Sequence, residues 1–404
     1  MPARPVTPPA VPAASRAAPP EGRLLGLDLA RGLAVLGMFA AHIGPDIVDG
    51  DAGGAVNQLT HGRSAALFAL LAGVSVVIIS GRRRPKSGRE GRRARAKIAI
   101  RGVALVALGT AVAMLPSPVD VIIAYYGLCF LLALPLARLP AKTLAVIAAF
   151  LAVAGPLVSF GVRALVEHRS WEHAVTAFDP IERLSGEGVV DLLLTGPYPA
   201  MTWMPYVVAG MALGRLDLMS GRVRRRLAVA GPALAVFGYG ASCLVFHLLP
   251  GVRAAVGDSG WFDSGPVTWW VGPETGTVST RAPALLLVAA PHSGTPLEIL
   301  GNVGVAITIV VCALAVVTAA EARRRVRRSL LPVIAVGSMS LSVYVGHVLA
   351  LAALDTVDAA SGLPVLVAFV VAALVLATLW ARRFRRGPLE YLLNAATRVT
   401  RRVG

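Results

Sequence analysis

The feature that most constrains this chain is a series of long apolar runs separated by short charged segments. A bilayer-spanning helix needs about 20 mostly apolar residues, because each residue advances the helix by about 1.5 Å. Only 15% of the residues are charged and 56% are hydrophobic, whereas a soluble protein carries about 25% charged residues. We predict an all-α, polytopic transmembrane bundle of about ten helices. The runs lie near residues 25–45, 62–81, 98–115, 119–137, 143–161, 198–215, 227–249, 296–319, 331–352 and 362–381.

The distribution of basic residues predicts the orientation of this bundle. Most of the 39 lysines and arginines lie in alternate connecting segments, with clusters at residues 82–97, 222–226, 323–328 and 382–386. Basic segments stay on the cytoplasmic side. With an even number of spans, we expect both termini in the cytoplasm and a multi-pass protein of the cell membrane. The net charge of +17 is explained by this orientation, and no nucleic-acid motif accompanies it, so we expect no nucleic-acid partner.

Composition also divides the chain into segments. Residues 1–22 are rich in Pro and Ala and are expected to form a disordered cytoplasmic tail. Residues 23–387 are expected to form the membrane domain, in contact with the lipid bilayer, and residues 388–404 a basic amphipathic cytoplasmic tail. Two long outer loops, 162–197 and 250–295, hold Trp and acidic residues, which suit either a substrate vestibule or an aromatic belt.

The first apolar run carries ionisable groups that a simple anchor would avoid. A charge near the bilayer centre costs roughly 2.5–3.5 kcal/mol on insertion scales. Asp28 and Arg31 are three residues apart and can pair on one face. Arg31 and His42 share a face about 16 Å apart along the helix axis. We expect an interior helix whose Arg31 and His42 border one cavity between the two membrane surfaces, packed through the small residues Ala30, Ala34, Gly37 and Ala41.

Polar groups in two further runs are candidates for the same cavity. His61, Arg63 and Ser64 precede or open the second run, near the outer surface. In the run at 331–352, Tyr344 and His347 recur at helical spacing on one face, which we expect to point away from lipid. A histidine can take a proton from a substrate hydroxyl or amine because its ordinary pKa lies near neutrality. The alternative for each is a hydrogen-bonded packing residue, or snorkelling in the case of Arg63.

The outer segment PHSGTP adds His292, followed by Glu298 and Asn302 at the start of the next run. These groups are expected either to orient a histidine or substrate, or to cap the helix. The three cysteines lie far apart in apolar runs without metal-ligand spacing, and no metal is expected. P-loop, GxGxxG, HExxH and GxSxG motifs are missing from the sequence.

The ordered segments of the chain resemble a known family. They are RLLGLDLARGLAVLGMFAAH, GRSAALFALLAGVS, YPAMTWMPYVVAGMALGRL, PHSGTPLEILGNVG, LSVYVGHVL and RRGPLEYLL. They are similar to the heparan-α-glucosaminide N-acetyltransferase-like proteins and to their bacterial YeiB-type relatives, over nearly the whole chain. The Arg31–His42 spacing, R-x10-H, also resembles the motif of integral-membrane acyltransferases that modify cell-surface sugars.

The resemblance implies transfer of an acyl group, commonly acetyl, from cytoplasmic acyl-CoA to an extracytoplasmic sugar or envelope acceptor. It implies that Arg31, Arg101 and the basic 82–97 segment meet the CoA phosphates, and that His42 acts as base or transient acyl carrier. His61 occupies the place of the active histidine of the animal lysosomal relative, but the Asn- and Trp-containing context is missing here. We therefore rank His42 first, with His61 and His347 as further catalytic candidates.

Asp28, Arg31, Arg63, Ser64, Tyr344, His292, Glu298 and Asn302 are the candidates for substrate binding. Two other function classes stay open from the residues alone. Ten spans with a polar centre also suit a transporter or exporter of a small or lipid-linked solute, for which flux without CoA dependence would be diagnostic. A scaffold in envelope biogenesis would use the polar groups for helix packing alone. A homodimer is a further expectation.

Overall fold

The computed structural model describes residues 25–45, 52–167, 179, 181–259, 276–321, 323–355 and 362–402. Within these ranges the secondary structure is helical and contains no strand, so the predicted all-α bundle is confirmed. The predicted N-terminal tail, and the parts of the outer loops that hold Trp171, Trp261, Trp269 and Trp270, lie outside the described residues.

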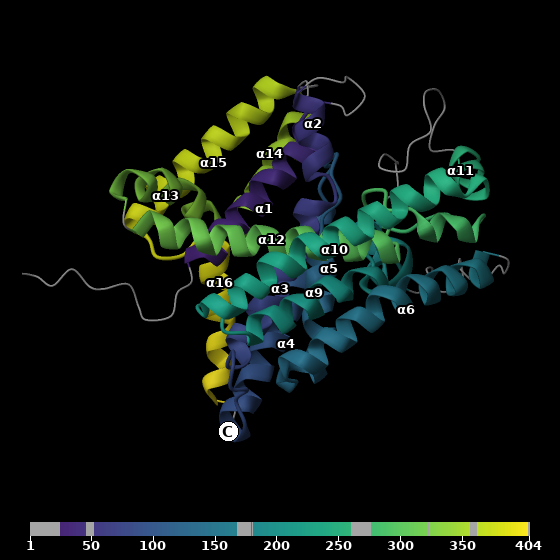
Figure 1. Cartoon of the computed structure of the whole chain (residues 1–404). Helices are drawn as coiled ribbons and strands as arrows, with labels where there is room; N and C mark the ends of the chain where they lie inside the picture. The colour runs from purple at the N-terminus through teal and green to yellow at the C-terminus, as the bar shows by residue number, and fades with distance from the viewer. Residues whose placement is uncertain are drawn as a thin grey trace, which may run out of the picture.

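The longer helices follow the predicted apolar runs in order (Figure 1). They are α1 (Leu25–Ile43), α3 (Arg63–Ser80), α4 (Gly88–Ala113), α5 (Ile123–Leu132), α6 (Ala141–Glu167), α9 (Ala200–Arg215), α10 (Gly221–Leu248), α12 (Pro296–Glu321), α13 (Arg324–Ser338), α14 (Ser340–Asp355) and α15 (Leu363–Arg383). Shorter elements connect them: α2 (Ala52–Thr60), η2 (Pro135–Arg138), α8 (Glu182–Ser185), η3 (Asp191–Thr195), α11 (Pro250–Gly257), η4 (Pro283–Leu287), α16 (Pro388–Ala396) and η5 (Thr397–Arg402).

Seven helices of the described ranges are long and apolar enough to cross a membrane, or eight if α13 and α14 count as one bent span. The remaining two predicted runs form shorter helices, α5 with 10 residues and α9 with 16. Prolines stand beside both helices, since Pro135 opens η2 after α5 and Pro199 is the N-cap of α9. Every predicted run therefore contains a helix, but fewer than ten are full-length spans.

The run predicted as one helix over 331–352 is broken, with α13 and α14 meeting at 77°. At the break, Gly337 packs directly on the carbonyl oxygen of Asp28, and a Cβ at this position would collide with it. The carboxylate of Glu390 in α16 accepts the N–H groups of Leu341 at 2.8 Å and Ser342 at 3.2 Å. It thereby satisfies the free donors of the first turn of α14, so the break costs little hydrogen bonding.

Helix α1 runs through the interior and packs against α3, α12 and α13 (Figure 1). Ala30 and Ala34 are 0% and 1% exposed, and their small side chains let neighbouring helices approach closely. The C-terminal end of α1 meets the start of α15, where Gly362 donates its N–H to the carbonyl of Ile43 at 3.0 Å. This interior position brings the predicted polar groups of α1 against other helices.

The opposite end of the bundle, called here the basic end, is fastened by arginines. Arg83 forms an ion pair with Asp217 at 2.9 Å and joins the loops after α3 and α9. The buried Arg215 donates to the carbonyls of Arg82, Ala137 and Leu139, and to the hydroxyl of Ser80. One guanidinium therefore connects three segments, because its donors fan out in a fixed plane. α16 and η5 lie beside α4 at this end (Figure 1).

Candidate active site

Two histidines from distant parts of the chain meet where α1 ends. Nδ1 of His42 lies 3.0 Å from Nε2 of His347 in α14, and the two rings stack with centroids 5.2 Å apart. Nδ1 of His347 lies 2.7 Å from the carbonyl oxygen of Tyr344. Since a carbonyl only accepts, this Nδ1 carries the proton, and Nε2 of a neutral His347 accepts the proton of His42 Nδ1. Nε2 of His42 is left unprotonated.

His42 borders a cavity of about 320 Å³, called here the histidine cavity. Its walls come from α1, the end of α2, the start of α3 and three loops. Among the predicted site residues, His42, His61, Ser64 and His292 share this lining. The polar residues around the cavity are His42, Thr60, His61, Ser64, Asp120, Tyr198 and His292. The volume and the polar groups suit a small hydroxyl- or amine-bearing ligand.

His61 and His292 face each other across one wall of the histidine cavity, with ring centroids 4.9 Å apart and an interplanar angle of 73°. Nδ1 of His61 is buried and has no hydrogen-bond partner in the part of the chain that the structure describes. Gly62 has a φ of 70° and packs on Pro291 and His292, so this turn needs a glycine. Burial, and then the nearby His61, lower the pKa of His292 to about 3, so that this ring is neutral.

Glu298 holds the loop that presents His292. Its carboxylate accepts the N–H groups of His292 at 2.8 Å and Gly294 at 2.7 Å, and the Ser293 hydroxyl at 3.2 Å. The Thr295 hydroxyl accepts the N–H of Glu298 at 3.2 Å, so Thr295 and Glu298 form a capping arrangement at the start of α12. The structure therefore gives Glu298 both contacts considered from the sequence, a helix cap and the backbone of a histidine.

Asn302 stands one turn behind Glu298, away from the histidine cavity. Its amide donates to Glu298 at 3.1 Å and to the Tyr206 hydroxyl at 3.2 Å, and its carbonyl oxygen accepts from the hydroxyl of Tyr239. Arg63 also lies outside the cavity lining. It donates to the carbonyl of Gln58 at 2.6 Å and stacks over the ring of Tyr239 at 4.8 Å. Both residues therefore support the walls rather than face the cavity.

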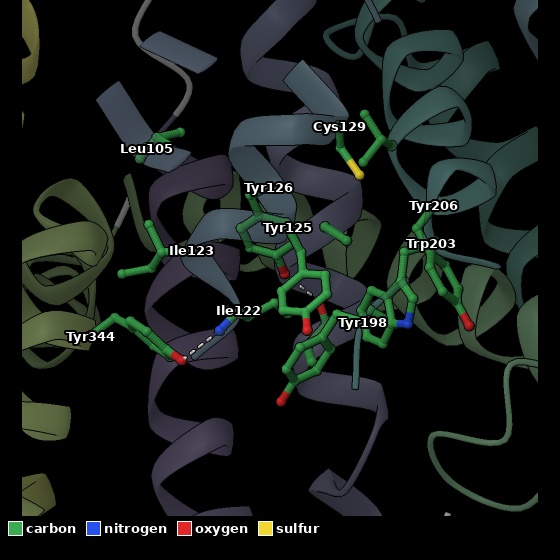
Figure 2. Packing of buried hydrophobic residues seen from close by; sticks show 14 of the residues in the cluster. Leu105, Ile122, Ile123, Tyr125, Tyr126, Cys129, Tyr198, Trp203, Tyr206 and Tyr344 are labelled. Carbon is green, nitrogen blue, oxygen red and sulfur yellow. Dashed lines mark hydrogen bonds between the residues drawn. The ribbon is translucent and has the colours of Figure 1, made fainter. Parts of the chain in front are cut away.

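Aromatic side chains pack together next to this site, and Figure 2 shows Tyr125, Tyr198 and Trp203 close to one another. Tyr198 contacts the rings of Tyr125, Trp203 and His292, with centroids 5.0–5.6 Å apart. The Tyr344 hydroxyl accepts the N–H of Ile122 at 3.3 Å, drawn as a dashed line in Figure 2, and donates to the carbonyl of Asp120 at 3.4 Å. Tyr344 thus connects α14 to the loop that carries Asp120.

Asp28 and Arg31 pair at 2.9 Å, and Arg31 also donates to the Ser75 hydroxyl at 3.0 Å. Arg31 does not belong to the lining of the histidine cavity, which reaches only Met38, Ala41 and His42 on α1. Val35 and Phe39, which lie between these two positions along α1, are 0% and 1% exposed. The structure therefore does not place Arg31 in the lining of the cavity that His42 borders. Arg101 is half-buried on α4 and is not part of this cavity either.

The residues missed at the sequence level are those of the loops, chiefly Asp120 and Tyr198. Asp120 ends the segment PSPVD, at the start of the apolar run predicted near residues 119–137. Only its expected position at the outer membrane surface indicated that it belongs to a site. Burial raises the pKa of Asp120. Burial, and then the charges of Asp120 and Asp191, raise the pKa of Glu187 to about 7. The described residues hold no group of three or more His, Cys, Asp and Glu arranged as metal ligands.

Two family models match the chain. The model described as "Heparan-alpha-glucosaminide N-acetyltransferase, catalytic" matches residues 23–249. The model described as "Protein of unknown function (DUF418)" matches residues 267–400. No curated protein matches the chain. His42 and His61 lie in the first matched region, and His292 and His347 lie in the second, so both regions contribute to the site.

Proposed function

Because the chain belongs to the heparan-alpha-glucosaminide N-acetyltransferase catalytic family, a family of membrane acetyltransferases, we propose that it transfers an acyl group, acetyl in the first instance, from cytoplasmic acyl-CoA to an extracytoplasmic sugar or other envelope acceptor. In this proposal the acceptor binds in the histidine cavity and His42 is the general base. Nε2 of His42 takes the proton of the acceptor hydroxyl or amine while the acceptor atom bonds to the acyl carbon. The carbon–sulfur bond of the thioester breaks, and the protonated Nε2 of His42 returns its proton to the thiolate, so that CoA leaves as its thiol.

The observation that carries the proposal is the hydrogen-bonded series from His42 to His347 to the Tyr344 carbonyl, at the wall of a polar cavity. A base whose second nitrogen is held by an orienting partner is the arrangement used to activate nucleophiles. The buried and unpartnered Nδ1 of His61 supports an acceptor with a complementary polar group.

On the donor side, we place the CoA phosphates at the basic end, against Arg101 and the exposed arginines of residues 82–97. Arg31 fits this role less well, because Asp28 and Ser75 already engage its guanidinium. Among the residues that the structure describes, no arginine of the basic end lines the histidine cavity. The proposal therefore requires a path for the thioester that is closed in this conformation.

The test is transfer of labelled acetyl from acetyl-CoA in membranes that contain the full chain. His42→Ala should lower the rate by about 10²–10⁴-fold, the usual contribution of a general base. His247→Ala is the matched control, because His247 is exposed on α10 and does not line the cavity. Wild-type activity in His42→Ala at equal protein level would reject the mechanism.

A transporter is the second candidate, favoured by the broken pair α13 and α14. Discontinuous helices at membrane depth form substrate and ion sites in secondary transporters. Here the free N-terminus of α14 is occupied by Glu390, which leaves less capacity for an anionic substrate. Solute flux in proteoliposomes without acyl-CoA would favour transport, and flux that appears only as acylated product would favour the transferase.

A further inference from the structure

A second void lies on the other side of the histidine pair. Helices α14 and α15 enclose a groove of about 670 Å³, called here the α14–α15 groove. Its walls are largely apolar and include several small side chains, which leave a channel where larger residues would interlock. The small residues are Gly346, Ala350, Ala353, Ala368, Ala372, Ala373 and Ala377.

The chemistry of the lining residues changes along the groove. His347 and Phe39 line its middle part, with ring centroids 4.5 Å apart, and Ala353 and Leu354 line one end. At the other end Trp380 and Pro388 line both the groove and a wider hollow of about 1080 Å³ at the basic end. The two voids therefore adjoin at these two residues.

The wider hollow is a cationic mouth. Arg383, Arg385 and Arg386 line it, and none of them forms an ion pair with a residue that the structure describes. The Trp380 indole donates to the carbonyl of Arg386 at 2.8 Å, and its ring lies 4.5 Å from that of Phe384. Tryptophan beside arginine is typical of the membrane interface, where anionic headgroups lie.

The length of the groove corresponds to one leaflet. Along α15, its lining extends from Trp380 to Ala368, which is about 18 Å at 1.5 Å per residue. The hydrocarbon of one leaflet is about 15 Å deep, half of a core of about 30 Å. A single lipid chain that starts at the arginines therefore reaches His347.

The few polar groups that line the groove favour a hydrocarbon chain over a polar chain as its ligand. The pantetheine arm of CoA contains amides, which need hydrogen-bond partners when buried. The Ser342 hydroxyl is engaged by Glu390 at 2.5 Å, and both ring nitrogens of His347 are engaged by His42 and Tyr344. The groove thus leaves no free polar partner for an amide at either of these side chains, whereas an acyl chain needs none.

We propose that the α14–α15 groove binds one acyl chain of an anionic phospholipid, with its phosphate at Arg383, Arg385 and Arg386 and its tail against Phe39 and His347. The lipid covers the back of the histidine pair, while the histidine cavity lies on its front. This assignment does not depend on the acyl-transfer reaction, because it concerns a bound lipid rather than a substrate that turns over.

The first test measures phosphatidylglycerol bound to the full chain in nanodiscs by native mass spectrometry. Ala372→Trp should fill the groove and lower the retained lipid by about tenfold. Val371→Trp is the matched control, because Val371 is 52% exposed on the same turn and does not line the groove. Equal retention in wild type and Ala372→Trp would overturn the proposal.

The second test addresses the headgroup. Joint substitution of Arg383, Arg385 and Arg386 by Gln should abolish the preference for phosphatidylglycerol over phosphatidylcholine. Arg382→Gln should retain it, because Arg382 lines a separate hollow with Leu25 and Arg328. An unchanged preference in the triple variant would contradict the assignment of the phosphate.

The third test uses the wild-type chain and so does not depend on a folded variant. A phosphatidylglycerol with a diazirine near the end of one tail should label α14 around Gly346 and Ala350 more than the lipid-facing residues of α10. Equal labelling of both helices would overturn the proposal. Loss of α14 labelling on addition of palmitoyl-CoA, with no loss on addition of unlabelled phosphatidylglycerol, would assign the groove to an acyl donor and overturn it as well.

Discussion

The histidine cavity and the α14–α15 groove lie on either side of the same pair of imidazoles, but the polarity of their walls differs. His42 faces a cavity of about 320 Å³ with carboxylate, hydroxyl and imidazole groups in its walls. His347 faces a larger groove, about 670 Å³, with almost wholly apolar walls. One hydrogen bond of 3.0 Å joins the two environments. The comparison teaches that a membrane protein can keep a polar centre next to hydrocarbon when the polar groups satisfy one another.

The two voids also differ in what keeps them open. The wall of the histidine cavity around His292 is a loop, and its backbone stays in place because Glu298 accepts its donors. The groove stays open because α14 and α15 carry alanine and glycine where they face each other. Loss of one carboxylate should therefore damage the cavity, whereas the groove should be sensitive only to added volume.

The largest effect is expected from Glu298→Ala. This change leaves four donors without their acceptor: the N–H groups of His292 and Gly294, the Ser293 hydroxyl and the Asn302 amide. Each buried unsatisfied group costs about 1–3 kcal/mol, so we expect a loss of about 3–5 kcal/mol in stability after partial relaxation. The measurement is thermal unfolding of the purified chain in detergent.

Glu298→Gln is the control for this prediction, since its amide oxygen still accepts and the loss should be smaller. Phosphatidylglycerol bound in the groove should be unchanged in Glu298→Gln. If Glu298→Ala unfolds at the wild-type temperature, the loop does not depend on this carboxylate and the contrast between the two voids fails.

An intermediate effect is expected from His347→Phe, which separates the two sides of the pair. Phenylalanine keeps a ring beside Phe39 and Tyr344 but removes the acceptor for Nδ1–H of His42. If His42 is the base, kcat for acyl transfer should fall by about 10–100-fold, the usual cost of losing an orienting partner, with little change in KM for the acceptor.

His347→Gln should restore part of the rate, because a glutamine oxygen can accept the same hydrogen bond. The pH profile of kcat should move in His347→Phe and return toward wild type in His347→Gln. A wild-type kcat in His347→Phe would show that the pair is a packing contact.

The smallest effect is expected from Glu187→Gln, in the loop before η3 and near Asp120. The pKa of Glu187 is raised to about 7, so its neutral form is favoured in the folded chain. Its contribution to stability is therefore complete below about pH 4.5 and is lost as the pH rises through 7. Glutamine stays neutral, so the variant should be more stable than wild type by about 1 kcal/mol at pH 8, after allowance for partial solvent screening.

This difference should vanish near pH 4.5, and unfolding temperatures across the pH range provide the measurement. Glu90→Gln, on α4 at the basic end, is the control for the loss of one carboxyl group. A constant difference between Glu187→Gln and wild type at all pH values would refute the titration.

Much of the fold was predictable because spanning helices are encoded locally. The apolar runs predicted the helices, and the small residues Ala30 and Ala34 predicted the buried face of α1. The break between α13 and α14 was not predictable, since it depends on Glu390, which follows Leu341 by 49 residues and meets it only in the folded chain. Hydropathy alone did not predict the short lengths of α5 and α9. The prolines beside them, Pro135 and Pro199, are the sequence features that mark these helix ends.

The candidate site was predictable in its residue types and less so in its arrangement. The helix-face argument placed Tyr344 and His347 toward the interior, and the structure places His347 against His42. Arg31 does not line that cavity and instead pairs with Asp28 and Ser75, because helical spacing gives the direction of a side chain but not its partners. The roles of these residues in catalysis stay predictions.

By itself, the sequence determined an all-helical membrane bundle, its family, and the presence of ionisable groups in its interior. These properties follow from composition, periodicity and ordered motifs, which are read along the chain. Only the tertiary structure decided that His42 donates to His347, that Glu298 holds the loop of His292, and that a polar cavity and an apolar groove meet at one pair of rings. The reason is that a hydrogen bond needs two groups within about 3 Å, and residues 305 positions apart reach that distance only when helices pack.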